Sequence, residues 1–331
     1  MNRALVMGSG SIAKRHIRNL RSQFPNADVI CVSSSGRKLT ISEVGATEVA
    51  DTISHALSIT PDIAIIASPA TFHLYHAQTL LEAGVPVLIE KPLCVEMTDL
   101  SKVPLDKYKA KIGVGYNLRF MPAAQMVKKI LAEGDIGQVL TVFAEVGQFL
   151  PDWRPDTDYR KGVSAKKKLG GGALLELSHE LDYLNWFFGK FSEVSAITRN
   201  SNILNIDVED SVDALLTNRQ GTIFHLHLDF LQRSPSRSFK AIGTKATLVW
   251  DLLANEVQLL KPDKESQLVF SDPSYDRNEM YVDQLNAFIE FSKGIRQFDS
   301  TLEKSIEVMR LIEAIRKSDA LKAWVNLKAV K

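Results

Sequence analysis

The 331-residue sequence predicts an α/β protein with two domains: a doubly wound parallel sheet, then an α+β domain with an open, mostly antiparallel sheet. Three observations support this prediction. The chain is longer than one ordinary domain of about 100 to 200 residues. Its first part alternates short, fully apolar runs with amphipathic stretches, which is typical of a parallel sheet covered on both faces. Its second part contains longer segments in which apolar and polar residues alternate.

The first part begins with a strand, a turn and a helix. An apolar run at residues 4–7 stops at Gly8, and residues 12–24 carry apolar side chains at helical spacing. A second apolar run at 29–32 completes a unit of roughly 30 residues, the size of one βαβ crossover. The same alternation predicts further strands at 62–67, 85–89 and 112–116 and a helix at 72–82.

The pattern changes near residue 118, so we expect one domain at 1–118 and a second at 119–331. A helix with Pro122 in its first turn opens the second domain. The clearest strand, 222–230, places apolar side chains on one face and His225, His227 and Asp229 on the other. The remaining predictions are strands at 139–149, 210–217, 239–243, 247–252 and 256–261, and helices at 122–133, 278–293 and 301–317.

Composition excludes several classes of protein. The formal net charge is +1, so no overall field draws the chain to nucleic acid or to an anionic membrane. The only cysteines, Cys31 and Cys94, lie in apolar segments without metal-site spacing and indicate a reducing compartment. The N-terminal apolar run is too short for a signal peptide, and no apolar stretch reaches the about 18 residues of a membrane span. We therefore expect a cytoplasmic protein.

A glycine turn joins the first strand to the first helix. Its sequence, Gly8-Ser9-Gly10-Ser11-Ile12-Ala13, fits the G-x-G-x-x-A fingerprint of a Rossmann domain. The first glycine makes the turn, the second lets the backbone approach a pyrophosphate, and Ala13 packs the helix on the strand. The helix N-terminus offers free N–H groups to the phosphates. This turn predicts a dinucleotide cofactor.

The second strand ends at the position that distinguishes NAD from NADP. An acidic residue would bind the ribose 2′-hydroxyl of NAD here, about 20 residues after the turn. The sequence instead has Ser33, Ser34 and Ser35, followed by Gly36 and Arg37, with no carboxylate at this tip. A guanidinium can bind a 2′-phosphate through two hydrogen bonds. We favour NADP over NAD, although a plain polar loop that admits either cofactor is the alternative.

Further motifs in this order resemble the Gfo/Idh/MocA family of oxidoreductases. They are the 68–73 segment Ser-Pro-Ala-Thr-Phe-His, the Glu90-Lys91-Pro92 triplet, and three glycines at 170–172 followed by a helix with Glu176, His179 and Asp182. The resemblance spans most of the chain. It implies a Rossmann domain, an open-faced α/β domain that forms substrate contacts and often the oligomer interface, and hydride transfer on sugars, inositols or nucleotide-activated sugars.

The resemblance assigns catalytic candidates to both parts of the chain. Lys91 corresponds to the family lysine beside the nicotinamide and the reacting hydroxyl, where an ammonium can polarise a carbonyl or share a proton. His179 is the candidate general acid or base, and Asp182 lies one helical turn further on. Glu176 is three residues before His179 rather than four, which departs from the commonest family pattern and leaves its role open.

The expected ligand contacts follow the same motifs. Arg119, in an Asn-x-Arg-Phe stretch, is a candidate for substrate binding, and a structural arginine is nearly as good an interpretation. The loop 151–168, with Tyr159 and Arg160, is a candidate lid for an anionic sugar or a solvated basic loop. Substrate candidates are thus Arg119, Tyr159, Arg160, Glu176 and His179. Cofactor candidates are Gly8, Gly10, Ser11, Ile12, Ser33, Ser34, Arg37, Ser68, Pro69, His73, Glu90, Lys91 and Asn117.

Rival interpretations remain at this stage. A dinucleotide-binding sensor without turnover would keep the same fold, although the presence of Lys91, His179 and Asp182 opposes it. A free-sugar or inositol dehydrogenase is a second alternative to an enzyme of nucleotide sugars. His225, His227 and Asp229 share a strand face, but we expect no metal there because the family uses none. We expect a homodimer or homotetramer, since an open sheet normally needs covering.

Overall fold

The computed structural model describes residues 1–262 and 266–330, which divide into two compact units. The first unit comprises Met1–Asn117 and Arg277–Ile306, and the second comprises Leu118–Asp276 and Glu307–Lys331. The chain first passes from one unit to the other between Asn117 and Leu118. The single division at 118 had not anticipated that a C-terminal segment returns to the first unit.

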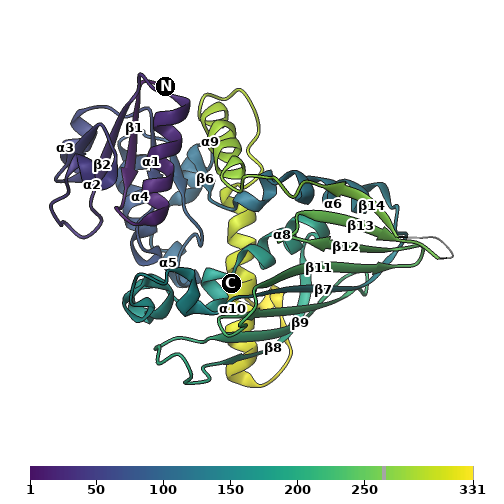
Figure 1. Ribbon diagram of the computed structural model, residues 1–331. Coiled ribbons are helices and arrows are strands. Elements are labelled where there is room, and N and C mark those ends of the chain that lie inside the picture. Colours follow the sequence, from purple (N-terminus) through teal and green to yellow (C-terminus); the bar gives the residue numbers. More distant parts are fainter. Residues whose placement is uncertain (263–265, 331) are drawn as a thin grey trace. The chain divides into compact units, whose positions relative to one another are not determined.

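A six-stranded parallel sheet forms the centre of the first unit (Figure 1). Its strand order, 3-2-1-4-5-6, is that of a dinucleotide-binding doubly wound fold. The side chains of strands β1 and β4 are almost wholly buried because helices cover both faces. In spatial order the strands are β3 (Glu48–Ala50), β2 (Asp28–Val32), β1 (Arg3–Met7), β4 (Ile63–Ile66), β5 (Val87–Ile89) and β6 (Ile112–Val114).

The first helix, α1 (Ser11–Gln23), packs on β1 through Ala13, Ile17 and Leu20, as the helical spacing predicts. Residues 33–61, which the sequence analysis left unassigned, form β3 and two short helices with threonine N-caps. The helices of this unit are α1, α2 (Ile41–Val44), α3 (Ile53–Ser58), α4 (His73–Glu82), α5 (Met97–Leu100) and α9 (Glu279–Ser292), with 3-10 turns η1 (Ala70–Phe72), η2 (Leu105–Lys111) and η3 (Asn117–Phe120), the last continuing into the second unit.

The returning C-terminal segment packs against both α1 and β6. Asn19 and Asn278 exchange amide hydrogen bonds of 3.2 and 2.8 Å. The backbone N–H of Val114 donates to Ser300 at 2.9 Å. A Cβ added at Gly113 would lie 2.7 Å from the Phe298 ring, so β6 and this segment are in close contact. The segment 277–306 is therefore an integral part of the first unit.

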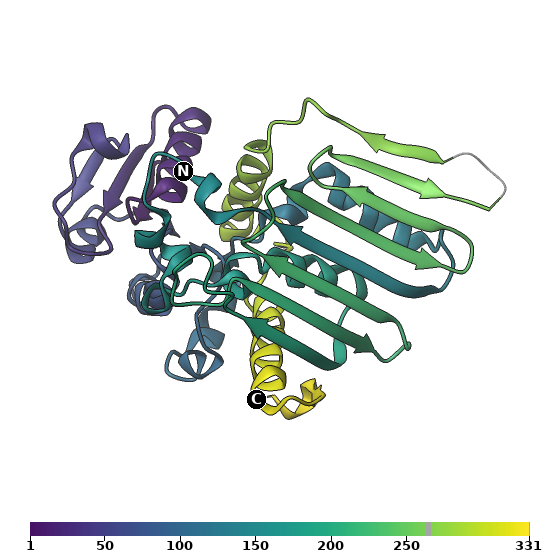
Figure 2. The ribbon, with the colours of Figure 1, turned by 60° about the horizontal axis from the view of Figure 1, so that its bottom comes forward.

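The second unit contains a nine-stranded sheet, seen face-on in Figure 2. Its strand pairs are antiparallel except for β7 with β10. In spatial order the strands are β14 (Gln267–Ser271), β13 (Glu256–Leu260), β12 (Thr247–Asp251), β11 (Ser236–Gly243), β7 (Val139–Gly147), β10 (Ile223–Asp229), β9 (Ser211–Asn218), β8 (Phe191–Arg199) and β15 (Val325–Asn326).

Helices cover one face of this sheet and leave the other open (Figure 2). Phe224, Leu226 and Leu228 of β10 are buried on the covered face, as the alternation predicts. Strand β8 was not predicted, because its apolar Ile197 lies on the open face and weakens the alternation of apolar and polar residues. The sequence analysis also missed β14 and β15. The helices are α6 (Pro122–Glu133), α7 (Ala173–Glu176), α8 (His179–Phe188) and α10 (Leu302–Leu321), the last beginning in the first unit, with 3-10 turns η4 (Leu150–Trp153), η5 (Tyr159–Lys161), η6 (Val163–Ala165), η7 (Lys167–Leu169) and η8 (Leu327–Ala329).

Within the described ranges, no helix combines the length and the apolar character that crossing a membrane requires.

Candidate functional site

The thirteen cofactor candidates all belong to the first unit, and most follow the carboxyl end of a parallel strand. Gly8 follows β1, Ser33 follows β2, Ser68 follows β4 by two residues, and Glu90 follows β5. Because these strands are parallel, their carboxyl ends meet at one edge of the sheet. Successive strands are added on one side of β1 up to β3 and on its other side from β4 onward, and open α/β sheets bind ligands at this switch between β1 and β4.

The glycine turn has the geometry that a dinucleotide needs. Gly8 has a φ of +117°, and a Cβ there would lie 2.4 Å from the carbonyl oxygen of Ala67. Only glycine fits this close approach between β1 and the end of β4. Gly10 is exposed, and a Cβ there would meet no atom within 4 Å. The helix begins at Ser11, and Ile12 follows it, so the N-terminus of α1 lies directly after this open position.

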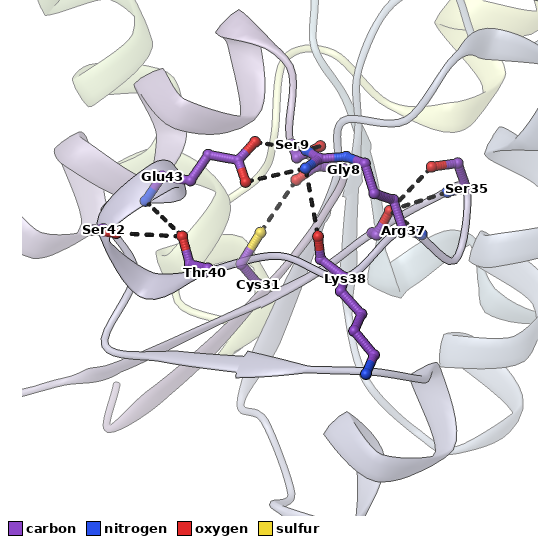
Figure 3. A network of polar contacts seen from close by, with 10 residues as sticks. Gly8, Ser9, Cys31, Ser35, Arg37, Lys38, Thr40, Ser42 and Glu43 are labelled. Carbon is purple, nitrogen blue, oxygen red and sulfur yellow. Dashed lines mark hydrogen bonds and ion pairs between the residues drawn. The ribbon is translucent and has the colours of Figure 1, made fainter.

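The tip of β2 forms a compact turn around the Ser33 hydroxyl. This oxygen accepts hydrogen bonds from the backbone N–H groups of Ser35 at 3.3 Å and Arg37 at 3.2 Å. Ser34 is half-buried in the same turn. Cys31, one residue before the end of β2, donates its thiol to the carbonyl of Gly8 at 3.3 Å. These contacts join the tip of β2 to the glycine turn (Figure 3).

Arg37 has a carboxylate partner that the sequence analysis did not find. Its guanidinium binds Glu43 through two hydrogen bonds, of 2.6 and 3.1 Å, and its Nη2 lies 3.5 Å from Ser9 Oγ (Figure 3). This hydrogen bonding holds the pKa of Glu43 below its usual value. The sequence shows no acid at the tip itself, and the fold brings Glu43 there from α2. The expectation that no carboxylate lies at this tip is therefore wrong for the folded chain.

Two histidines fix the segment that follows β4. His73 is buried, with Nδ1 2.8 Å from the carbonyl of Pro92 and Nε2 2.8 Å from that of Ser68. Burial lowers its pKa, so the neutral ring can donate to one of these carbonyls at a time. His76 Nδ1 lies 3.0 Å from Ser68 Oγ, and burial lowers its pKa to about 4. Ser68, Pro69 and His73 therefore form one packed loop beside the 90–92 segment.

The Glu90-Lys91-Pro92 segment contains the residue expected to be catalytic. The Lys91–Pro92 peptide bond is cis, and the Lys91 side chain is half-buried. The Glu90 carboxylate lies 2.6 Å from His16 Nε2 and accepts from the Lys91 backbone N–H at 3.3 Å. His16 is fully buried on α1, directly after the glycine turn. Sequence reasoning counted His16 only as a residue of the helix face, and its position one turn after Ala13 was the available signal.

Asn117 and Arg119 differ in their surroundings although they are two residues apart. Asn117 is buried, and its Nδ2 has no hydrogen-bond partner within residues 1–262 and 266–330. Arg119 is fully buried and binds Asp182 through two hydrogen bonds of 2.9 and 2.7 Å. Its guanidinium also lies 5.5 Å from the centre of the Trp186 ring. This environment matches the structural interpretation of Arg119 and gives Asp182 a partner other than His179.

The predicted helix with Glu176, His179 and Asp182 is broken in the structure. Helix α7 ends at Glu176, and α8 begins at His179. Glu176 and His179 therefore do not share one helical face, and that part of the expectation is wrong. Both side chains are half-buried, whereas Asp182 is fully buried. His179 occupies the first position of its helix.

The glycine triplet before these helices is explained by close packing. Gly172 has a φ of +110°, and a Cβ there would lie 2.3 Å from Glu209 Oε1. That same carboxylate oxygen accepts from the backbone N–H of Leu174 at 3.1 Å, which fixes the start of α7. A Cβ at Gly171 would lie 2.3 Å from the carbonyl of Val163. The triplet thus lets α7 pack against both Glu209 and the preceding loop.

The loop expected to be a lid, 151–168, contains the four 3-10 turns η4 to η7. Tyr159 is half-buried and donates its hydroxyl to the carbonyl of Leu204 at 3.0 Å. Arg160 is exposed and binds Asp158 at 2.8 and 3.2 Å. In the same unit the fully buried Glu180 accepts from Arg237 at 2.7 Å. Sequence reasoning missed this second ion pair because Glu180 follows His179 without any motif.

His227 lies on the open sheet face between two carboxylates. Nδ1 is 2.7 Å from Asp213, and Nε2 is 2.9 Å from Asp229. The hydrogen bond to Asp229, followed by that to Asp213, raises the pKa of His227 to about 9. His225 instead stacks on Phe143, with ring centres 4.5 Å apart. Among the described residues, no three His, Cys, Asp or Glu side chains are grouped to hold a metal ion.

Comparison with protein families gives two matches in chain order. Residues 2–115 match a family described as an oxidoreductase family with an NAD-binding Rossmann fold, and residues 124–249 match the GFO/IDH/MocA C-terminal domain. These two ranges cover most of the chain, the first containing β1 to β6 and the second containing β7 to β11. The same order of domains was implied by the motif resemblance.

The chain is also similar to individual oxidoreductases in sequence and in structure. A 1,5-anhydro-D-fructose reductase of Ensifer adhaerens is 26% identical over 261 residues, which is 74% of each chain. A dTDP-3,4-didehydro-2,6-dideoxy-alpha-D-glucose 3-reductase of Actinomadura kijaniata is 26% identical over 77% of this chain and 76% of its own. A solved levoglucosan dehydrogenase, in complex with NADH and levoglucosan, has a TM-score of 0.84 at 20% identity and 98% coverage of both chains.

Proposed function

Since the chain belongs to the Gfo/Idh/MocA family of oxidoreductases, we propose that it transfers a hydride between a nicotinamide dinucleotide and a hydroxyl or keto carbon of a sugar or nucleotide-activated sugar. The observation that carries this proposal is the edge of the first sheet. There the glycine turn follows β1, and the Glu90-Lys91-Pro92 segment follows β5 of the same parallel sheet. This edge is the ligand-binding position of the fold.

The residues at this edge fit a dinucleotide. The close approach at Gly8 leaves no room for a side chain, while the space at Gly10 is open enough for a pyrophosphate. The buried Nδ2 of Asn117 can donate a hydrogen bond to a ligand, since none of the described residues accepts from it. When bound, the nicotinamide supplies the hydride donor or acceptor. The protein then has to bind, orient and move one proton.

We propose that Lys91 and His179 transfer the proton that accompanies hydride transfer. Lys91 directly follows Glu90, whose carboxylate is fixed by the buried His16. His179 begins α8, and its side chain is half-buried with Nδ1 fully buried. An imidazole within hydrogen-bond reach of an alcohol can exchange a proton with it. Asp182, bound by Arg119, is a positioning residue for this helix.

Turnover and its dependence on these residues test the proposal. The purified chain is saturated with NADH or NADPH, and sugars are screened by nicotinamide absorbance. The panel comprises levoglucosan, 1,5-anhydro-D-fructose, inositols, glucose 6-phosphate and nucleotide sugars. Lys91→Met and His179→Ala are expected to lower kcat by about 10²-fold or more. The exposed residues Lys111 and His55 supply the matched controls Lys111→Met and His55→Ala, which retain activity.

Two outcomes would contradict the enzyme. Dinucleotide binding without turnover on the whole panel would support the sensor alternative, in which the fold is kept without chemistry. No dinucleotide binding would overturn the proposal altogether. Turnover on levoglucosan or an inositol, but on no nucleotide sugar, would select the free-sugar alternative. The exposed Arg160 on the loop 151–168 is the feature that favours an anionic substrate.

We further propose that the cofactor is NADP and that Glu43 limits the preference for it. Arg37 is the candidate partner of the 2′-phosphate because it lies within 3.5 Å of Ser9 on the glycine turn. A phosphate at Arg37 would have to share the guanidinium with Glu43, whose carboxylate is 2.6 Å away. Two anions on one guanidinium repel each other, so Glu43 weakens NADP binding relative to NAD.

Binding constants of single variants test this cofactor assignment. Arg37→Ala is expected to weaken NADPH binding about tenfold and to change NADH binding little, because only NADPH carries the 2′-phosphate. Glu43→Gln is expected to strengthen the binding of NADPH more than that of NADH. Ser42→Ala is the control on the same short helix, since its hydroxyl contacts Thr40 and not Arg37. An equal effect of Arg37→Ala on both cofactors would show that Arg37 does not recognise the 2′ position.

We also propose that the chain forms a homodimer or homotetramer through the open face of the second sheet. Strands β7, β8, β9 and β10 expose the apolar side chains of Phe143, Ile197, Leu215 and Ile223 on this face. Polar residues lie between these four side chains, and a partner surface laid on this face would cover all four together. Sedimentation of the wild type and of Ile197→Lys compares the oligomeric state, with the exposed Leu321→Lys as the control. A monomeric wild type contradicts the proposal.

A further inference from the structure

The second unit contains a cavity of about 900 Å³ that the proposed reaction does not use. It is bounded by the end of α8, the start of β8, the turn between β9 and β10, α10 and the C-terminal segment. None of the catalytic, cofactor or substrate candidates lines it. Its volume lies within the range of roughly 300 to 1,000 Å³ that is typical of small-molecule sites.

The charged side chains around this cavity are strongly unbalanced. Among residues 1–262 and 266–330, four cations line it, against the single carboxylate of Glu307: Lys190, Arg219, Arg310 and Lys328. Glu307 Oε1 accepts from Lys190 at 2.8 Å and from Arg310 at 2.5 Å. Arg219 and Lys328 are exposed, and the part of the chain that the structure describes gives their side chains no hydrogen bond or ion pair. The cavity thus carries an excess of positive charge that one internal carboxylate does not balance.

The cations stand on elements whose positions are fixed. Strand β15 pairs with β8 through Val325 and Val194, which places the C-terminal segment along the sheet edge. The Asn326 side chain then caps η8 by accepting from the backbone N–H of Lys328 at 2.9 Å. The bridging Glu307 holds Lys190 and Arg310 together. Two of the four positive groups are thus placed before an anion binds, which lowers the entropic cost of binding.

The cavity also has an apolar wall. Phe191, Leu311 and Val330 are buried there, and the half-buried Phe188 packs edge-on against Phe224 with ring centres 5.0 Å apart. Amide side chains of Asn185, Gln220 and Asn326 complete the lining. An apolar wall, a few amides and several cations together fit a ligand that joins a ring to a multivalent anion.

We propose that this cavity is a second ligand site, which binds a nucleoside phosphate. Guanidinium groups bind phosphate oxygens through paired hydrogen bonds, and more than one negative charge is needed to match the cations. The ring contacts Phe188 on the apolar wall, and the phosphates lie between Arg219 and Lys328. The site is separate from the dinucleotide edge, because its lining residues belong to the second unit.

Calorimetry on the full chain tests the proposal with pyrophosphate and ADP as probes. The titrations are made without any dinucleotide, and ADP binding that persists unchanged in the cavity variants is assigned to the first unit. Both probes are expected to bind to the wild type, ADP more tightly. The double variant Arg219→Gln/Lys328→Gln is expected to weaken both at least tenfold. The double variant Lys245→Gln/Lys317→Gln removes two exposed cations outside the cavity and is expected to have no effect.

Further variants separate the parts of the ligand. Phe188→Leu is expected to weaken ADP and leave pyrophosphate unchanged, because only ADP carries a ring. The absence of binding at millimolar probe would overturn the proposal. So would equal losses in the two double variants, or ADP binding no more tightly than pyrophosphate. A change of oligomeric state in Arg219→Gln/Lys328→Gln without any probe binding would assign these cations to an interface and also overturn it. Cofactor binding and turnover are separate measurements, so this test stands independently of the proposed reaction.

Discussion

At the scale of single residues, Gly8 shows how a backbone position can require one amino acid for two reasons. Its φ of +117° disfavours any side chain, and the Ala67 carbonyl oxygen occupies the place that a Cβ would take. Strain of this kind and overpacking each cost about 1 to 3 kcal/mol. The same small residue leaves the backbone accessible for a pyrophosphate.

We therefore expect Gly8→Ala to lower the free energy of unfolding by about 2 to 4 kcal/mol and to reduce dinucleotide binding. Gly36→Ala is the matched control. Gly36 also has a positive φ, of +71°, but a Cβ there would meet no atom within 4 Å. It should cost only about 1 kcal/mol. Denaturant unfolding measures both variants, and equal losses would show that the Ala67 contact does not matter.

His227 couples the stability of the second sheet to pH. Its pKa in the folded chain is about 9, above an unfolded value near 6.5, because of Asp229 first and then Asp213. A raised pKa stabilises the folded state fully below about pH 6.5, and this contribution disappears as pH rises through about 9. His227 is partly exposed, so solvent screening reduces the effect to about 1 kcal/mol.

Urea unfolding between pH 6 and 9.5 measures this contribution. The wild type is expected to lose stability over this range, whereas His227→Gln should give a flatter profile. His225→Gln is the control on the same strand face, because His225 stacks on Phe143 and not on a carboxylate. A wild-type profile with the same slope as that of His227→Gln would contradict the assignment.

At the scale of elements, the buried pair of Arg119 and Asp182 joins η3 to α8. Both side chains are almost fully buried, and two hydrogen bonds satisfy them. Removing one member leaves the other as an uncompensated buried charge, which costs about 3 to 5 kcal/mol. Replacing both with apolar residues avoids that cost.

Accordingly, Arg119→Met and Asp182→Leu should each destabilise the chain by about 3 to 5 kcal/mol, and the double variant should be more stable than either. Chemical denaturation of the three variants gives the coupling energy. If the double variant loses the sum of the single losses, the pair does not act as a unit. The kinetic consequence is expected in kcat through the placement of α8, since Asp182 is a positioning residue.

At the scale of the whole molecule, the return of residues 277–306 to the first unit has a consequence for folding. Helix α9 packs on α1, and the Asn19–Asn278 pair and the Val114–Ser300 hydrogen bond fasten the segment. Phe288 and Phe298 are buried in this unit with ring centres 5.8 Å apart. A fragment that stops at Asn117 would expose their apolar partners to water.

A fragment of residues 1–117 is therefore expected to be less stable than the same fragment joined by a flexible linker to residues 277–306. The expected gain is several kcal/mol, because burying one large apolar side chain contributes about 1.5 to 3 kcal/mol. A fusion to residues 307–331 is the control. Thermal unfolding of the three proteins measures the difference, and equal transitions would show that the returning segment is dispensable.

The sequence by itself determined the features that depend on local pattern. Period and burial placed β1, α1, β4 and β10 to within a residue or two, since hydrophobic spacing directly reflects which face is covered. The glycine turn and the Glu90-Lys91-Pro92 segment indicated the family, which the domain matches confirm. The missed strand β8 carries the apolar Ile197 on its exposed face, so its alternating pattern was weak.

Only the tertiary structure decided which side chains meet. Glu43 reaches Arg37, His16 reaches Glu90, and Arg119 reaches Asp182 across 6, 74 and 63 positions in the chain. Local pattern cannot report such pairs, because sheet order and chain return set the distances between elements. The break of the predicted helix at residues 177–178 and the cationic cavity around Glu307 have the same origin. Spacing along the chain therefore predicted the helices and strands. Packing between separate segments determined which charged side chains meet, and the proposed function depends on those contacts.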